Sequence, residues 1–343
     1  MLLRKGYKLS NFVPPLVTIA IPTYNRANLY LIQAIESALN QTYPNLEIII
    51  SDNCSTDDTE MVVRSFKDPR IRYFKQEKNI GGNNNFNFCL KQARGEYFLL
   101  LMDDDLIDSD FIETCMQGVN YDCNYGIIRT GTRIIDSQGI LINECPNMVG
   151  GLSLDNFFRG WFAYKTTLYI CSTLFNTKRL KEFGGFQSKK NLFQDVIVEA
   201  KLAAKYGRYD IKSVKASART HTFEFTFAAK VSDWCEDSLD LLNLMCELVS
   251  KESKVLIKKE GMYFFSKINY DRARAVKSPV KRFIAYVTVF KKFKYRYPPS
   301  IKHLFYLAHD YFGETSLYRF LRSIKRKIKR KEVKINPLAN KGL

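Results

Sequence analysis

Three consecutive aspartates, residues 103–105, follow the apolar run "EYFLLLM" at residues 96–102. Adjacent carboxylates repel one another unless a cation or hydrogen-bond donors offset their charge. Oxygen ligands of this kind suit a hard divalent cation, Mg²⁺ or Mn²⁺, and Mg²⁺ is usually shared between carboxylates and substrate phosphates. The alternative is a solvated acidic turn in which Asp108 or Ser109 caps the next helix.

Two more polar segments follow apolar runs, "PTYNR" at residues 22–26 and "SDNCSTDD" at residues 51–58. In the first, Thr23, Tyr24 and Asn25 offer an aromatic face and hydrogen-bonding groups. In the second, Asp52 and Asn53 have an acceptor and an amide that suit the edge of a base or a ribose hydroxyl. A base reader, an aromatic wall and a metal together favour a nucleoside diphosphate. The sequence has no Walker loop and no dinucleotide fingerprint, so an ATPase or a nicotinamide enzyme is not expected.

Strand and helix patterns alternate around these segments. Short apolar runs predict strands at residues 16–21, 46–53, 71–76 and 96–102, and helices are expected between them, most clearly at residues 29–41 from their three-and-four spacing. This rhythm implies a parallel sheet with helices on both faces. Ligands bind at the carboxyl ends of such strands, so the three polar segments should meet at one edge and form one site.

Several motifs in order carry a resemblance to a known family: "VTIAIPTYNR", "ALNQTYPNLEIIISDNCSTDDT" and "KNIGGNNNFNFCLKQARGEYFLLLMDDD". Over residues 16–110, and more weakly to about residue 225, the chain resembles the family 2 glycosyltransferases. The resemblance implies the α/β GT-A fold, with a Rossmann-like, mostly parallel sheet flanked by helices. We therefore predict a catalytic domain at residues 1–230, divided into a nucleotide-sugar half (16–110) and an acceptor half (111–230). Residues 231–343 would form a helical, basic C-terminal region.

The resemblance also implies where the donor nucleotide binds. It assigns this role to Pro22, Thr23, Tyr24, Asn25, Asp52, Asn53, Asn79 and Asp103, with Asp52 on the base, usually uracil. The family commonly has a second acid where Asn53 stands and a glycine where Cys54 stands. An arginine-asparagine pair that often precedes "GEY" is also missing, and Phe86 and Asn87 lie nearest to its place.

The metal motif of the family is Asp-x-Asp, and its first acid falls on Met102, which cannot bind a hard cation because a thioether is a soft ligand. We predict Asp104 as the direct ligand of Mn²⁺ or Mg²⁺, with Asp105 beside it, although a register shifted by one residue would pair Asp103 with Asp105. The segment "ARTHTFEF" resembles one in which a histidine approaches the metal. His221 is therefore a further candidate ligand, and a structural hydrogen bond is its alternative role.

The general base of the family opens a helix about ninety residues after the metal motif, and "LFQDVIVEA" matches it with Gln194 in place of the first acid. Asp195 is thus the candidate base, which implies single displacement with inversion at the sugar carbon. Its alternative role is that of an acidic residue favoured at a helix N-terminus. We expect Glu199, one turn later, to lie on the surface, although it could orient or replace Asp195.

The basic residues are concentrated in the C-terminal part of the chain. The protein has 53 Lys and Arg against 35 Asp and Glu, yet residues 1–250 hold 28 basic and 29 acidic side chains, whereas residues 251–343 hold 25 and 6. "SLYRFLRSIKRKIKRK", at residues 316–331, predicts a basic amphipathic helix on an anionic membrane, or else a solvated charged helix. No stretch is long enough to span a bilayer or to resemble a signal peptide.

These features predict a cytoplasmic inverting glycosyltransferase, peripheral on the inner face of the cytoplasmic membrane. It would move a sugar, UDP-linked by preference, to a glycan or lipid-linked glycan in bacterial surface polysaccharide assembly. Two alternatives remain: a nucleic-acid-binding protein that uses the basic tail, and a degenerate transferase that only binds glycans or partners. The first is disfavoured because no nucleic-acid-binding module is evident. The second rests on the replacement of common acids by Met102, Asn53 and Gln194.

Overall fold

The structure is a computed structural model, and it describes residues 12–27, 30–220, 229–301, 303 and 304. The chain divides into two compact units, one of Met1–Ala228 with Leu241–Lys258 and the other of Ala229–Asp240 with Lys259–Leu343. The first unit is an α/β unit built on one sheet, and the second is helical.

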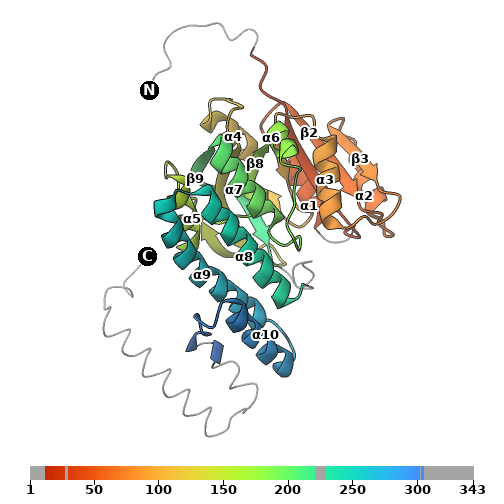
Figure 1. Ribbon diagram of the computed structural model, residues 1–343. Coiled ribbons are helices and arrows are strands. Elements are labelled where there is room, and N and C mark those ends of the chain that lie inside the picture. The colour runs from red at the N-terminus through yellow and green to blue at the C-terminus, as the bar shows by residue number, and fades with distance from the viewer. Residues whose placement is uncertain (1–11, 28–29, 221–228, 302, 305–343) are drawn as a thin grey trace, which may run out of the picture. The chain divides into compact units, whose positions relative to one another are not determined.

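The N-terminal half of the first unit alternates strand and helix, as predicted (Figure 1, red to orange). Its elements are β1 (Val17–Thr23), α1 (Leu31–Leu39), β2 (Leu46–Asp52), α2 (Thr59–Ser65), β3 (Ile71–Lys75), α3 (Gly82–Gln92) and β4 (Tyr97–Leu100). The four strands lie in the order β3-β2-β1-β4 and all pair in parallel. Every residue of β1, β2 and β4 is buried, which explains their continuous apolar runs, since parallel strands are covered on both faces.

Parallel and antiparallel strands mix in the second half. It contains β5 (Leu106–Ile107), α4 (Phe111–Gly118), β6 (Ile127–Ile135), β7 (Leu141–Cys145), α5 (Leu154–Phe162), the 3₁₀ turn η1 (Ile170–Ser172), β8 (Thr173–Asn176), α6 (Thr177–Glu182), α7 (Gln194–Tyr206) and β9 (Arg208–Arg219). The sheet continues from β4 as β8-β6-β9-β5, with β7 paired to β6. Strands β6 and β7 form an antiparallel hairpin. Gly184 follows α6 and Gly207 follows α7, with positive φ angles of 80° and 75°.

The path of the chain after β4 sets the position of the aspartates. The next strand, β5, does not pair with β4 but with β9, at the far end of the strand order. Residues 103–105 therefore connect two distant positions in the sheet. Gly95, just before β4, permits the close packing here, because a Cβ at this position would lie 2.6 Å from the backbone nitrogen of Thr18.

The helical unit contains the start of α8 (Val231–Leu248), most of α9 (Lys251–Arg274) and α10 (Pro279–Lys292). Its interior is aromatic, and the Arg272 guanidinium lies 3.6 Å from the centroid of the Trp234 ring. His303 is buried and contacts Asp271 at 3.1 Å. Among the described residues, no helix is long and apolar enough to cross a membrane.

Candidate active site

Parallel pairing brings the ends of β1 and β2 together. Thr23, the last residue of β1, lies opposite Asp52, the last residue of β2, and the backbone N–H of Asn53 donates to the Thr23 carbonyl at 2.9 Å. Tyr24 follows with 44% of its surface exposed. This edge of the sheet therefore has buried polar side chains, Thr23 and Asp52, with the exposed ring of Tyr24 beside them.

The aspartates join the same edge through Asp103. The Thr23 hydroxyl donates to Asp103 Oδ2 at 2.7 Å, and Arg26 Nε lies 3.8 Å from Asp103 Oδ1. Burial, followed by the charge of Asp104, raises the pKa of Asp103 to about 7, although Arg26 and Thr23 act in the opposite direction. The three strand-end segments thus meet, as the strand order predicts.

Asp105 is anchored on the other side, by β9. The backbone N–H of Arg219 donates to Asp105 Oδ1 at 2.9 Å, and Arg219 Nε donates to the Asp104 carbonyl at 2.8 Å. Burial and the neighbouring Asp104 raise the pKa of Asp105 well above its usual range. We call residues 103–105 the aspartate turn, since Asp105 N–H closes it on the Met102 carbonyl at 3.1 Å.

Asp104 is the most exposed member of the aspartate turn. Asp103 and Asp105 are 6% and 7% exposed and are held by β1 and β9, whereas Asp104 is only partly buried between them. Three carboxylates at one turn, two of them with raised pKa values, form an oxygen-rich donor set whose repulsion a divalent cation would offset. The carboxylate oxygens are of the chemical type that Mg²⁺ or Mn²⁺ takes as ligands. No side-chain cluster of three or more His, Cys, Asp or Glu groups in the described part of the chain is arranged as a preformed metal site.

The helix cap that the acidic-turn alternative expected is not made by Asp108 or Ser109. The N-cap of α4 is Asp110, with no side-chain capping bond, rather than Asp108 or Ser109. Asp108 instead forms a two-pronged ion pair with Arg133, at 2.7 and 2.9 Å, because β5 brings it alongside β6 and β9.

Asp52 is fully buried, and both of its carboxylate oxygens already accept hydrogen bonds. The backbone N–H of Ser55 donates to Oδ1 and the Tyr73 hydroxyl to Oδ2, each at 2.7 Å. The neighbouring Asn53 amide donates to Asn79 Oδ1 at 3.0 Å. Asn53 and Asn79 are therefore brought together, and Asp52 holds the shape of this loop.

Two residues in these loops have left-handed backbone conformations. Asn25 has φ 53° and Cys54 has φ 67°. The Asn25 N–H donates to Ser55 Oγ at 2.8 Å, and the Thr56 N–H donates to Asn25 Oδ1 at 2.9 Å, which ties the first two loops together. A positive φ at Cys54 also explains the glycine that the family commonly has there.

Asp195 lies in the first turn of α7 and is partly buried. Burial raises the pKa of its carboxyl to about 6, while the backbone N–H groups of Val196 and of Asp195 itself act in the opposite direction. A carboxylate with a pKa near 6 is a competent proton acceptor at neutral pH.

The prediction of a surface position for Glu199 is wrong. Its side chain is fully buried, accepts a hydrogen bond from Thr173 Oγ1 at 3.0 Å, and lies 3.4 Å from Arg129 Nε. Arg129 on β6 is also buried and pairs with Asp210 at 3.2 Å, and Arg208 pairs with Asp210 at 2.7 Å. The sequence of α7 gives no sign of the charged partner of Glu199, which is Arg129 on β6. Glu199 therefore anchors α7 to β6 and does not face solvent.

Two arginines at the site were not singled out from the sequence. Arg26 and Arg219 occur in the motifs "PTYNR" and "ARTHTFEF", and only their charge could have marked them as partners for the aspartates. His221, two residues beyond Arg219, lies outside the described residues, as does the predicted amphipathic helix at 316–331.

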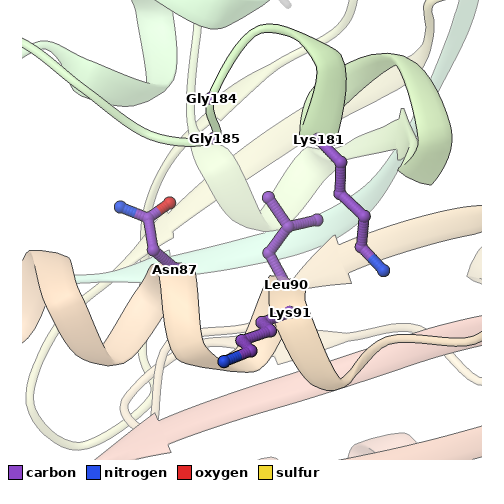
Figure 2. Close-up of a pocket in the computed structure, with 6 residues that line it drawn as sticks. All are labelled: Asn87, Leu90, Lys91, Lys181, Gly184 and Gly185. Carbon is purple, nitrogen blue, oxygen red and sulfur yellow. The ribbon is translucent and has the colours of Figure 1, made fainter.

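A separate hollow of about 290 Å³ lies between α3 and the turn after α6 (Figure 2). Asn87 holds this turn, because its amide donates to the Phe186 carbonyl at 3.0 Å and its oxygen accepts from the Phe186 N–H at 2.8 Å. A Cβ on Gly185 would lie 2.2 Å from Asn87 Oδ1, so the glycine makes this contact possible. None of the predicted site residues lines the hollow.

Comparison with known proteins identifies the family. The family model described as glycosyl transferase family 2 matches residues 18–173. An uncharacterized glycosyltransferase of Rickettsia typhi is 42% identical over 262 residues, which are 75% of this chain and 80% of the relative. A chondroitin synthase of Escherichia coli is 38% identical over 135 residues, 39% of this chain. A GalNAc(5)-diNAcBac-PP-undecaprenol beta-1,3-glucosyltransferase of Campylobacter jejuni is 41% identical over 133 residues, 38% of this chain.

The chain covers less than half the length of several curated relatives, including 19% of the chondroitin synthase and 42% of the Campylobacter protein. Among solved structures, Staphylococcus aureus TarS in complex with UDP-GlcNAc has a TM-score of 0.61 at 19% identity, over 91% of each chain. The mannosyltransferase PcManGT of Pyrobaculum calidifontis, in complex with GDP-Man and Mn²⁺, has a TM-score of 0.53 at 17% identity, over 99% of this chain and 92% of that one. The fold is therefore GT-A, as predicted, and the chain belongs to the family 2 glycosyltransferases.

Proposed function

We propose that the protein is a metal-dependent, inverting glycosyltransferase that takes its sugar from a nucleoside diphosphate donor, UDP-linked by preference. The aspartate turn carries this proposal, because it meets β1 through Thr23 and β9 through Arg219 at the edge where sheets of this type bind ligands. The nucleotide sugars named with TarS and PcManGT support the donor class, and Mn²⁺ in the latter supports the metal.

In this proposal, Asp104 and Asp105 would hold the ion, with His221 as a third candidate ligand. Mn²⁺ or Mg²⁺ bound there would supply positive charge against the charge that grows on the leaving diphosphate. Asp103 is held toward the donor by Thr23. The nucleoside lies against the exposed ring of Tyr24, while Pro22 is buried at the end of β1 and supports this loop from beneath. The loops of Asn25, Asp52, Asn53 and Asn79 shape the rest of the donor site.

Asp195 accepts the proton of the acceptor hydroxyl. Attack by that hydroxyl from the side opposite the diphosphate inverts the configuration at the sugar carbon. Arg129 and Glu199 hold α7, and therefore Asp195, in place. The acceptor is a glycan or a lipid-linked glycan, a class supported by the undecaprenol-linked acceptor in the name of the Campylobacter relative. Such a role belongs to the cytoplasmic face of the membrane in bacterial surface polysaccharide assembly.

A panel of UDP- and GDP-sugars tests the proposal, by thermal shift with and without Mn²⁺. A donor at about 100 times its Kd stabilises the folded state by about 2.7 kcal/mol, which is enough to raise the melting temperature measurably. Because the proposal requires the metal for donor binding, one donor should give this increase only when Mn²⁺ is present. Turnover of that donor, measured as released nucleotide, should then depend on Asp195. Binding without turnover for every acceptor tried would favour the degenerate transferase, and no binding at all would contradict the proposal.

A further inference from the structure

Helix α10 (Pro279–Lys292) has an exposed apolar stripe along one side. Val280, Ile284 and Val287 are 59%, 57% and 45% exposed, and their spacing of four and three residues places them on one helix face. Single exposed apolar side chains are ordinary, but an aligned row of them indicates a binding surface.

The stripe is a consequence of ordered packing. The other face of α10 carries Ala285, Tyr286 and Val289, which are buried, and Ser278 caps the helix by accepting a hydrogen bond from Lys281 N–H. The helix is thus fixed in rotation by its inner face, and its outer face is left apolar.

The chain segment that carries the stripe is basic, and the acidic group that pairs with α10 is Glu236 of α8, 2.9 Å from Lys292. Residues 272–309 contain ten Lys and Arg and no Asp or Glu. Within α10, Lys281 and Lys291 are exposed, and Lys294 and Arg296 follow just beyond the helix, also exposed. An apolar row flanked by cations is complementary to an anionic lipid surface, which has phosphates outside and hydrocarbon beneath.

We propose that α10 docks the protein on an anionic membrane, with its apolar stripe inserted at the boundary between headgroups and acyl chains. Fourteen residues make a helix about 21 Å long, too short to span the bilayer, so it lies in the plane of the membrane. Aliphatic side chains find no complement on a nucleic-acid backbone, and this favours the lipid surface over RNA or DNA. The proposal goes beyond sugar transfer and is independent of the segment at 316–331.

The test is co-sedimentation of the full-length protein with phosphatidylcholine vesicles, alone or with phosphatidylglycerol. We expect binding to the anionic vesicles that weakens with added salt, and much weaker binding to the neutral ones. Ile284→Glu should weaken partitioning by at least about tenfold, because it removes apolar burial and adds a charge that the surface repels. Ile140→Glu is the matched control, since Ile140 is 59% exposed and lies outside α10, and its partitioning should stay within about twofold of wild type.

A second variant isolates the charges. Lys281→Gln with Lys291→Gln should weaken binding to anionic vesicles by at least about fivefold and leave neutral vesicles unaffected. Absence of anionic binding by the wild type, or equal effects of Ile284→Glu and Ile140→Glu, would overturn the proposal. In that case, a dimer that Ile284→Glu converts to monomer would identify a second copy as the occupant. If Ile284→Glu lowered the melting temperature and Ile140→Glu did not, another segment of the same chain would be identified as the occupant of the stripe.

Discussion

The Thr23 hydroxyl at the end of β1 donates a 2.7 Å hydrogen bond to the Asp103 carboxylate, 80 residues further along the chain. This bond joins the first strand-end loop to the aspartate turn. It therefore couples the part of the proposed site that would hold the nucleoside to the part that would hold the diphosphate.

Thr23→Val should weaken that coupling. The isosteric change leaves a buried carboxylate without one donor, which should lower the free energy of unfolding by about 1–3 kcal/mol and weaken donor binding. Thermal shift with and without donor measures both effects. Thr114→Val is the control, because the Thr114 hydroxyl makes only a 3.4 Å contact with Asp110. Equal effects of the two substitutions would show that the Thr23 bond has no special role.

Asp195→Asn should abolish sugar transfer and retain donor binding. In the wild type, kcat/KM should fall about tenfold per pH unit below a pH near 6, where the Asp195 carboxylate takes up a proton. A profile that is flat from pH 5 to 8 would exclude Asp195 as the base.

Asp195→Asn should affect stability differently from activity: it abolishes transfer but should not destabilise the fold. The folded-state pKa of Asp195 is raised above its usual value, so the folded protein holds the proton more tightly than the unfolded chain does. The stability that this group contributes is thus present at low pH and is lost as pH rises through about 6. Asp195→Asn removes that loss, so its melting temperature at pH 8 should equal or exceed that of the wild type. A clear decrease would indicate a structural role for the carboxylate.

Glu199→Ala should destabilise the protein strongly. The substitution leaves the buried Arg129 guanidinium short of one partner, and breaking a buried ion pair in this way costs about 3–5 kcal/mol. Glu182→Ala is the control, because Glu182 bonds Tyr206 on the exposed surface and should cost at most about 1 kcal/mol. Chemical denaturation measures both values, and a small effect at Glu199 would contradict its role in holding α7.

Cys54→Gly should stabilise the fold by up to about 1 kcal/mol. A side chain at φ 67° costs about 1–2 kcal/mol, and glycine relieves that strain at a smaller cost in chain entropy. Cys54→Ala, which keeps the Cβ, separates the backbone effect from loss of the thiol and should not stabilise. A glycine variant no more stable than the alanine variant would show that the loop is not strained.

Much of the nucleotide half was predictable from sequence, because its strands are buried on both faces and read as continuous apolar runs. Because parallel strands end at the same edge of a sheet, the alternation of strands and helices was enough to place Thr23, Asp52 and the aspartate turn together. The helix starts were less predictable: α4 begins at Phe111 with Asp110 as its N-cap, rather than with a cap by Asp108 or Ser109.

The second half of the fold resisted prediction because its pattern is mixed. The strand β9 is twelve residues long, and its N-terminal two thirds is partly exposed, so it has no clean apolar alternation. Its last residue, Arg219, meets Asp105 across 114 residues of sequence. No local pattern encodes such a contact, nor the pairing of Glu199 with Arg129.

The most direct test is Mn²⁺-dependent donor binding by Asp104→Asn, with Asp110→Asn as a matched control. Asp110 is an aspartate of the same segment, 46% exposed at its side chain and paired with Lys215. If the aspartate turn holds the metal and the donor diphosphate, Asp104→Asn should lose the Mn²⁺-dependent thermal shift and at least about 100-fold in turnover, while Asp110→Asn keeps both. Intact Mn²⁺-stimulated donor binding and turnover in Asp104→Asn would contradict this account of the site.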